Sequence, residues 1–164
     1  MYINCNITEL KKDELNEISA MIFKDEIGKK YYPTEQVILN LLEEGHKFDR
    51  MYVAKNGTEI IGFIWFQEKG AFYIYPYLQM IYVKKEYRKF GVGRTLLDFF
   101  ENASLNGSDY TKIKNKVFLC VGEWNLNAIK FYNKAGYTEI GVLPGLFRKR
   151  VNERLYMKEC INKV

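Results

Sequence analysis

The sequence has few of the residues on which several kinds of catalytic site depend. His46 is the only histidine among 164 residues, so a metal site built from several histidines is excluded. A serine or cysteine nucleophile activated by histidine would have to use His46, which follows a helix-ending Gly45 in a segment that reads as a polar loop. We therefore expect His46 to be a surface loop residue.

The three cysteines, Cys5, Cys120 and Cys160, are odd in number, lie far apart and form no Cys-x-x-Cys pair. This argues against a disulfide framework and a zinc site, and we expect three small buried hydrophobic residues in a reducing compartment. No apolar run approaches the roughly 18–20 residues of a membrane span, and the N-terminus lacks a signal-peptide pattern. The expected location is the cytoplasm, without a membrane partner.

Length and composition are those of one globular domain with a sizeable core, and we expect a single domain over residues 1–164. The net charge of +5 is modest for this length. Basic residues are concentrated at 84–94 and 148–154 but also recur along the chain, so nothing demands nucleic-acid binding. The expected oligomeric state is a monomer or a homodimer.

Hydrophobic periodicity predicts the element order β-α-α-β-β-β-α-β-α-β-β. The expected strands are 2–7, 51–55, 58–67, 72–83 with an interruption at Pro76, 117–121, 137–143 and 154–158. The expected helices are 12–23, 33–45, 91–103 and 125–134. Turn residues predict a polar loop over 25–33, hairpins at Asn56-Gly57 and Lys69-Gly70, and a turn over 106–109.

The segment 83–97, VKKEYRKFGVGRTLL, reads as a strand end, a basic turn and two glycines that open an amphipathic helix. A helix N-terminus attracts phosphate through its unpaired N–H groups and the positive end of its dipole. The segment is not a P-loop, which needs Gly-x4-Gly-Lys-Ser/Thr. It is not a dinucleotide fingerprint either, because Leu96 stands where the third glycine is required.

A second segment, 125–137, has the pattern Asn-x-x-Ala-x-x-Phe-Tyr-x-x-x-Gly-Tyr. With Arg-x-x-Gly-x-Gly at 88–93, it resembles the two signature blocks of the GNAT superfamily of N-acetyltransferases, in the same order. The resemblance covers nearly the whole chain. It implies a mixed α/β (α+β) GNAT fold, with a mostly antiparallel sheet of about seven strands, splayed between strands four and five and flanked by about four helices.

The same resemblance implies transfer of an acetyl group from acetyl-coenzyme A to a primary amine, without a metal. In the family, the pantetheine arm pairs with the backbone of strand four, and the diphosphate binds the following loop, largely through backbone amides. Phe90 stands where many relatives have a small or charged residue, which backbone binding should tolerate. The residues so implied in cofactor binding are Ile81, Tyr82, Val83, Arg88, Lys89, Phe90, Gly91, Val92, Gly93, Arg94, Asn125 and Tyr132.

The resemblance implies that Tyr132 is the general acid that protonates the leaving thiolate, and a phenol does stay protonated at neutral pH. The general base is less defined, because Gln79 and Cys120 stand where relatives often carry a glutamate on strands four and five. Glu123, just past strand five, is the carboxylate nearest to the cleft that the resemblance implies between strands four and five. It is the candidate base. A water relay is the alternative.

The acceptor amine is not determined by the sequence. In this family, acceptor specificity comes from the N-terminal helices and the last hairpin. Aromatic and cationic residues at these places, with others expected nearby, suit a small amine, an amino acid or a peptide terminus better than a polycation. They are Tyr31, Tyr32, Phe147, Arg148 and Arg150, with Trp65, Tyr75 and Tyr77.

Two other functions compete with an acetyltransferase. One is a GNAT-fold module that binds acyl-coenzyme A without catalysis, which the missing strand carboxylate leaves open. The other is a small basic nucleic-acid binder, which the two sequence blocks do not support.

Overall fold

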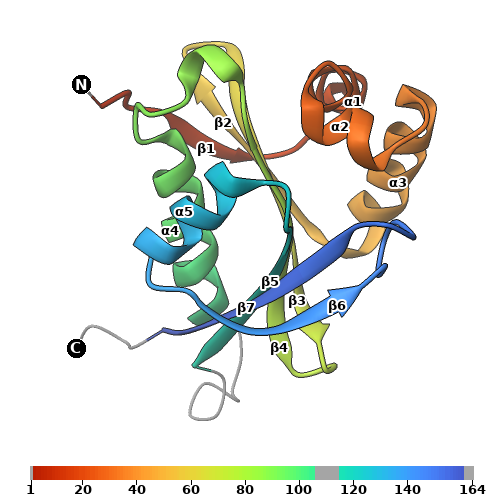
Figure 1. Cartoon of the computed structure of the whole chain (residues 1–164). Coiled ribbons are helices and arrows are strands. Elements are labelled where there is room, and N and C mark those ends of the chain that lie inside the picture. Colours follow the sequence, from red (N-terminus) through yellow and green to blue (C-terminus); the bar gives the residue numbers. More distant parts are fainter. Residues whose placement is uncertain (1, 106–114, 161–164) are drawn as a thin grey trace. The chain divides into compact units, whose positions relative to one another are not determined.

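The computed structural model describes residues 2–105 and 115–160, and Figure 1 shows its strands and helices. The strands are β1 (Asn6–Glu9), β2 (Arg50–Asn56), β3 (Glu59–Ala71), β4 (Tyr75–Val83), β5 (Lys116–Gly122), β6 (Thr138–Pro144) and β7 (Asn152–Glu159). The helices are α1 (Leu15–Phe23), α2 (Glu26–Tyr31), α3 (Glu35–Phe48), α4 (Val92–Leu105) and α5 (Leu126–Lys134). Two short 3-10 helices are η1 (Lys12–Glu14) and η2 (Lys85–Tyr87).

The strands form one seven-stranded sheet in the order β1-β2-β3-β4-β5-β7-β6. The pairs β1–β2, β2–β3, β5–β7 and β6–β7 are antiparallel. By contrast, β4 and β5 are parallel, with Tyr77 opposite Phe118 and Leu78 opposite Leu119. This mixed α/β architecture confirms the fold class expected from the sequence. The predicted turn over 106–109 lies outside the described residues.

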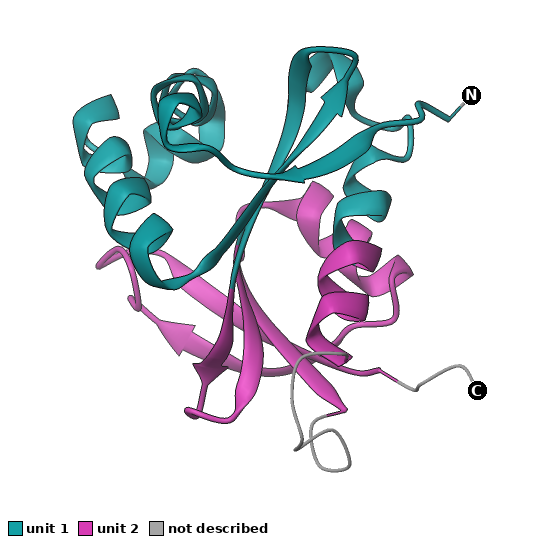
Figure 2. Ribbon diagram, turned by 180° about the vertical axis from the view of Figure 1, so that it is seen from behind, with its two compact units in different colours: residues 1–66, 80–97 teal, residues 67–79, 98–164 magenta. Residues whose placement is uncertain are grey.

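The chain divides into two compact units, drawn in different colours in Figure 2. Unit 1 consists of Met1–Phe66 and Met80–Leu97, and unit 2 of Gln67–Gln79 and Asp98–Val164. Unit 1 therefore contains α1, α2, α3 and the first turn of α4. Unit 2 contains the parallel pairs between β4 and β5, together with α5, β6 and β7.

The core of unit 1 is built by helices that bury one apolar stripe. Ile18 and Ile22 of α1 are fully buried, as are Ile38 and Leu42 of α3, and the two helices pack against each other. Apolar residues spaced three or four apart lie on one face of a helix, which is why the sequence pattern located both helices. Phe63 of β3 belongs to the same buried cluster.

Residues 26–31, predicted as part of a polar loop, form the additional helix α2. The Asp25 side chain caps it by accepting a hydrogen bond from the Glu26 amide at 2.6 Å. Gly28 of this helix is buried against α1. It lies so close that an added Cβ would overlap the backbone of Ile22. The close approach of α1 and α2 depends on this glycine. The six residues of α2, of which only Ile27 and Tyr31 are large and apolar or aromatic, are too few to show a repeating apolar stripe.

The predicted end of the second helix at Gly45 is also wrong. Helix α3 continues to Phe48, and Gly45 is buried inside it against the ring of Trp65. His46 consequently lies in the helix and not in a loop, with its Nε2 atom 3.0 Å from the carbonyl oxygen of Leu10. Here glycine serves close packing and does not stop the helix.

The hairpin turn predicted at Lys69-Gly70 lies three residues later. Strand β3 continues to Ala71, and the turn is closed by a hydrogen bond from the Ile74 amide to the Ala71 carbonyl at 3.1 Å. Phe72 and Tyr73 occupy this turn with φ of 54° and 59°. Pro76 does not interrupt β4; it is buried near the start of the strand, where proline costs least.

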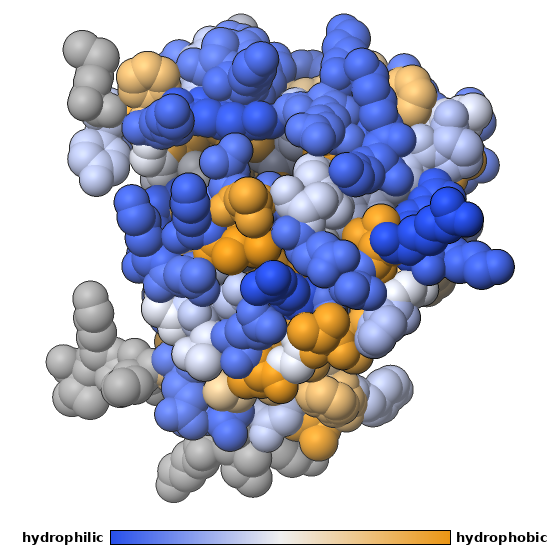
Figure 3. Space-filling view, in the orientation of Figure 1, coloured by the Kyte–Doolittle hydropathy of each residue, from blue (hydrophilic) through white to orange (hydrophobic). Residues whose placement is uncertain are grey.

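Several smaller expectations can now be compared with the structure. Strand β1 begins at Asn6, later than predicted. The three cysteines are free, as expected, but Cys160 is buried whereas Cys5 and Cys120 are half-buried. Among the described residues, none of the helices combines the length and the apolar character that crossing a membrane requires. The face in Figure 3 is mainly hydrophilic, with its hydrophobic residues in small separate groups.

We predict that Gly45→Ala destabilises the protein, although alanine normally favours a helix by about 1 kcal/mol over glycine. The added methyl group would overlap the Trp65 ring and lie 2.6 Å from the Met51 Cε atom. Overpacking of this kind costs about 1–3 kcal/mol, so the net free energy of unfolding should fall. Urea unfolding measures it, with Glu43→Ala on the exposed face of α3 as the control. An increase in stability for Gly45→Ala would contradict the close packing described here.

Candidate active site

Strand β4 ends at Val83 and leads into a turn with unusual backbone geometry. After η2, Lys89 and Gly91 have φ of 70° and 89°. Glycine adopts such left-handed conformations without cost, whereas lysine does so at about 1–2 kcal/mol. This turn contains the expected diphosphate loop, and it immediately follows the expected pantetheine-binding residues Ile81, Tyr82 and Val83.

Helix α4 begins at Val92, one residue after Gly91. Thr95 donates its amide to the Gly91 carbonyl at 3.0 Å and its hydroxyl to the same oxygen at 3.2 Å. The amides before Thr95, such as those of Val92 and Gly93, belong to the first turn, where no carbonyl within the helix can accept from them. The turn therefore ends at a helix N-terminus, as the sequence predicted.

The N-terminal segment lies against the same turn, which the sequence did not reveal. Ile3 donates its amide to the Phe90 carbonyl at 3.0 Å. An added Cβ on Gly91 would lie 2.8 Å from the Cε1 atom of the Tyr2 ring. Gly91 is therefore favoured by its φ, and a side chain at this position would also have to displace the exposed Tyr2 ring.

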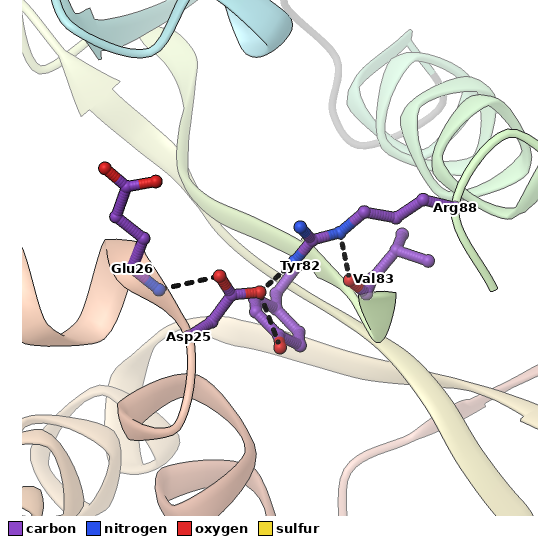
Figure 4. A network of polar contacts seen from close by, with 5 residues as sticks. All are labelled: Asp25, Glu26, Tyr82, Val83 and Arg88. Atoms are coloured by element: carbon purple, nitrogen blue, oxygen red, sulfur yellow. Dashed lines mark hydrogen bonds and ion pairs between the residues drawn. The ribbon is translucent and has the colours of Figure 1, made fainter. Parts of the chain in front are cut away.

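Arg88 is held by a polar network within unit 1, shown in Figure 4. Its Nε atom donates to the Val83 carbonyl at 2.9 Å, and its Nη2 atom forms an ion pair with the Asp25 carboxylate. The Tyr82 hydroxyl donates to the same carboxylate oxygen at 3.1 Å. The guanidinium also lies 5.6 Å from the centre of the Tyr82 ring, within cation–π range. The N-cap residue of α2 is thereby linked to the end of β4 and to the basic turn.

These contacts change the proton affinities of the groups involved. Partial burial acts to raise the pKa of Asp25, but the Glu26 amide, the Arg88 guanidinium and the Tyr82 hydroxyl together hold it below its usual range. Burial and then the Asp25 charge raise the pKa of Tyr82 to about 12. At neutral pH the network therefore contains a carboxylate, a guanidinium and a neutral phenol.

Tyr132, the expected general acid, lies on α5 in unit 2. The helix is capped by Asn125, whose Oδ1 atom accepts a hydrogen bond from the Ala128 amide at 3.2 Å. The Tyr132 side chain is only 5% exposed, and its ring lies 5.6 Å from that of Tyr137 and 6.5 Å from that of Tyr156. Burial raises the pKa of Tyr132 well above its ordinary value, so the phenol retains its proton.

The candidate base Glu123 is exposed at the end of β5. Its Oε2 atom accepts from the Asn152 side-chain amide at 3.2 Å, and its own amide donates to the Asn152 carbonyl at 3.0 Å. Gln79, at the position where relatives often carry a glutamate, is half-buried on β4. Neither residue is a buried carboxylate.

A buried carboxylate does exist in unit 2, at Glu153 on β7, and the sequence reasoning missed it. Glu153 is 2% exposed. It lies opposite Gly122 of β5 in the antiparallel register. The predicted strand began one residue later, because a glutamate preceding Arg154 reads as a solvent-exposed strand end. The available signal was the spacing of Glu153 two residues before Leu155, because residues two apart in a strand lie on the same face of the sheet.

The residues expected near the acceptor divide between the units. In unit 1, the Tyr31 and Tyr32 rings lie 6.5 Å apart, whereas Trp65 is buried and donates its indole N–H to Asp49 at 2.7 Å. Trp65 is therefore a core residue. In unit 2, Tyr75 and Tyr77 are half-buried on β4. Phe147, Arg148 and Arg150 lie in the turn between β6 and β7, where half of the Phe147 side chain is exposed.

The acetyltransferase (GNAT) family model matches residues 13–137. The match includes the turn after β4, the N-terminus of α4 and the whole of α5. The protein belongs to the GNAT acetyltransferase family.

Solved structures agree with this assignment in fold. A GNAT-family acetyltransferase from Bacillus cereus is 21% identical, with a TM-score of 0.74, over 97% of this chain and 99% of the other. The Vibrio cholerae spermidine N-acetyltransferase in complex with CoA and spermine is 18% identical, with a TM-score of 0.69, over 94% of this chain and 95% of the other. The chain thus has the GNAT fold from near its beginning to near its end.

We predict that Asp25→Asn lowers the free energy of unfolding by about 1 kcal/mol at pH 7, because it removes the ion pair with Arg88, which is partly exposed and screened. The folded pKa of Asp25 is depressed, so its contribution is present above the unfolded pKa of about 3.9 and is lost as the pH falls through the lower folded pKa. Urea unfolding at pH 7 and near pH 3 should show the difference shrink.

Glu44→Gln is the control for this measurement, because its ion pair with Lys47 is exposed on both sides. It should change stability by less than about 0.5 kcal/mol at either pH. An Asp25→Asn effect of equal size at both pH values would show that the charge of Asp25 is not its cause.

Proposed function

We propose that this GNAT-family protein transfers an acetyl group from acetyl-coenzyme A to a primary amine, and that residues 1–164 act as one catalytic domain. The observation that carries the proposal is the turn between β4 and α4. Left-handed backbone at Lys89 and Gly91 leads into a helix N-terminus, and a basic sequence surrounds it. Such a turn suits a diphosphate because backbone N–H groups and the helix dipole both favour an anion.

In this proposal, the backbone of Ile81, Tyr82 and Val83 pairs with the pantetheine arm of the cofactor. The backbone of the following turn holds the diphosphate, and Asn125 bonds the pantetheine amide while it caps α5. Arg88 contributes positive charge, although its ion pair with Asp25 neutralises part of it. The diphosphate-binding residues are Arg88, Lys89, Phe90, Gly91, Val92, Gly93 and Arg94.

Tyr132 is proposed as the general acid that protonates the departing thiolate. Its raised pKa supports this role, because an acid must keep its proton until charge develops on sulfur. The base predicted from the sequence is Glu123 or a water molecule.

The acceptor is proposed to be a primary amine on a small molecule, an amino acid or a peptide terminus. The neighbour from Vibrio cholerae acts on spermidine, which supports an amine acceptor in general. A panel of spermidine, amino acids, peptides and an aminoglycoside, assayed for thiol release from acetyl-coenzyme A, tests the proposal. Thiol release with none of them, alongside tight cofactor binding, would favour the non-catalytic acyl-coenzyme A-binding module.

The cofactor assignment predicts different results for two substitutions of Gly93. Gly93→Val should weaken coenzyme A binding at least tenfold, or about 1.4 kcal/mol, because the side chain would keep the diphosphate from the first turn of α4. Gly93→Ala is the matched control, since the family block accepts alanine there. Gly91 is unsuitable, because its φ of 89° would make any substitution a test of folding. Calorimetry showing wild-type affinity in folded Gly93→Val would refute the assignment.

The acid assignment predicts that Tyr132→Phe lowers turnover by about 10²-fold or more while cofactor affinity changes little. The ring would keep its contacts with Tyr137 and Tyr156, so the fold should persist. Tyr137→Phe, which removes a neighbouring buried hydroxyl, serves as the control and should retain activity. If Tyr132→Phe kept more than about half of wild-type turnover with chemistry rate-limiting, the general-acid role would be wrong.

A further inference from the structure

Glu153 is placed by three strands of unit 2. On β7 it lies opposite Gly122 of β5 and opposite Leu143 of β6. Its 2% exposure means that the carboxylate has been removed from bulk water. Removing a carboxylate from water is costly, so a buried glutamate is a candidate for a functional group.

The register places Tyr77, Cys120 and Glu153 on one face of the sheet. Residues directly opposite in adjacent strands have side chains on the same face, and so do residues two apart along one strand. Glu153 therefore shares a face with Gly122 and with Cys120, two residues earlier. Tyr77 joins them because it lies opposite Phe118, two residues before Cys120.

The side chains of these residues interact. Interaction between the Tyr77 hydroxyl and the Cys120 thiol acts to raise the pKa of Tyr77 and to lower that of Cys120. Burial above all, then Cys120, Glu153 and Tyr132, raise the pKa of Tyr77. Burial and the Glu153 charge likewise raise the pKa of Cys120, against the effect of the Tyr77 hydrogen bond. The charge of Glu153 therefore acts on both groups, which share its face of the sheet, and Tyr132 acts on the pKa of Tyr77.

Aromatic rings cover the neighbouring part of this face. The Phe118 ring lies 5.5 Å from the Phe72 ring, edge to face, and 5.4 Å from the Tyr75 ring. These rings lie beside Tyr77 on the same face, and Phe118 is opposite Met157, four residues along β7 from Glu153. Carboxylates attract an alkylammonium group through charge, and aromatic rings attract it through cation–π contact.

The edge of β5 beside these residues does not continue its pairing with β4. In the described chain, the β4–β5 pairs are Tyr77–Phe118 and Leu78–Leu119, whereas β5 pairs with β7 as far as Gly122. Around Cys120, β5 is therefore paired with β7 on one of its edges, and its other edge is not paired with β4. This is where Glu153, from β7, shares a face of the sheet with Cys120 and Tyr77.

We propose that Glu153 binds the ammonium group of the acceptor and is the general base of the acetyl transfer. The inference rests on the proposed function and replaces Glu123 in the role of base. Glu123 is one residue beyond Gly122 but is exposed and hydrogen-bonded to Asn152. Glu153, in contrast, is screened from water, which strengthens its attraction for an ammonium group.

The proton balance is complete with these residues. Glu153 takes one proton from the acceptor ammonium and later returns it to solvent. The neutral amine nitrogen forms a bond to the thioester carbonyl carbon, and the carbon–sulfur bond breaks. Tyr132 gives its proton to the leaving sulfur and recovers one from the amide nitrogen as it forms. One proton is released for each acetyl group transferred from the ammonium form of the acceptor.

The test compares Glu153→Gln with wild type, using whichever amine of the panel the wild type acetylates. We expect kcat/KM for the amine to fall by about 10²-fold or more, and the acidic limb of its pH profile to disappear. The dissociation constant for coenzyme A should be unchanged. Glu159→Gln is the matched control, because it removes an exposed carboxylate from the same strand, and it should leave all three quantities unchanged.

A second readout reports the position of Glu153 independently of activity. Tyr77 of β4 and Cys120 of β5 are titratable groups on the same face, and the Glu153 charge raises the pKa of both, while Leu143 lies opposite Glu153 on β6. Removal of the Glu153 charge should lower the pKa of Cys120. The rate of Cys120 alkylation, followed by peptide mass spectrometry, should then rise at lower pH in Glu153→Gln than in wild type.

Glu153→Asp keeps the charge but shortens the side chain by one methylene group. This variant serves as the test if Glu153→Gln does not fold. It should retain the acidic limb and lose about tenfold in kcat/KM. Wild-type kcat/KM in folded Glu153→Gln or in Glu153→Asp would overturn the proposal, as would loss of the acidic limb in Glu123→Gln alone. Absence of wild-type activity with every amine would instead overturn the proposed function, while the alkylation shift would still report on Glu153.

Discussion

The short parallel ladder between β4 and β5 is the constraint on which the candidate site depends. Tyr77–Phe118 and Leu78–Leu119 are its pairs in the described chain, whereas β5 pairs with β7 over seven residues. Beyond Leu119, strand β5 is therefore paired with β7 but no longer with β4. A strand edge left in this way presents backbone groups and side chains without distorting the rest of the sheet. Tyr77, Cys120 and Glu153 gather at this edge.

Each of the two units contains its own kind of candidate group. Unit 1 offers mainly backbone groups, in a turn that contains left-handed residues and leads into a helix N-terminus. Arg88 is fixed there by Asp25 and by the Val83 carbonyl. Unit 2 offers side chains, of which Tyr132 is a protonated phenol and Glu153 a buried carboxylate. The acid and the base proposed here have different surroundings, which suits them to act in one reaction at one pH.

Much of the fold was predictable because it follows from local patterns. The stripes of α1 and α3 and the β2–β3 hairpin needed no tertiary information, and the two family blocks located the turn before α4. The errors in the sequence-based prediction arose where tertiary contacts determine the structure. Gly45 looked like a helix end until the Trp65 ring showed why no Cβ fits, and Gly28 concealed α2 in the same way. Glu153 could not be recognised because burial of a glutamate depends on strands distant in sequence.

The turn between β4 and α4 also bears on how far sequences can diverge while such a site persists. Its geometry depends on two left-handed positions and on main-chain groups, of which every residue type except proline has the same set. Side chains at the other positions of the turn can therefore drift with little effect on its shape. Divergence of this kind is consistent with a common fold among chains that share about a fifth of their residues, such as this protein and its Bacillus cereus neighbour at 21% identity.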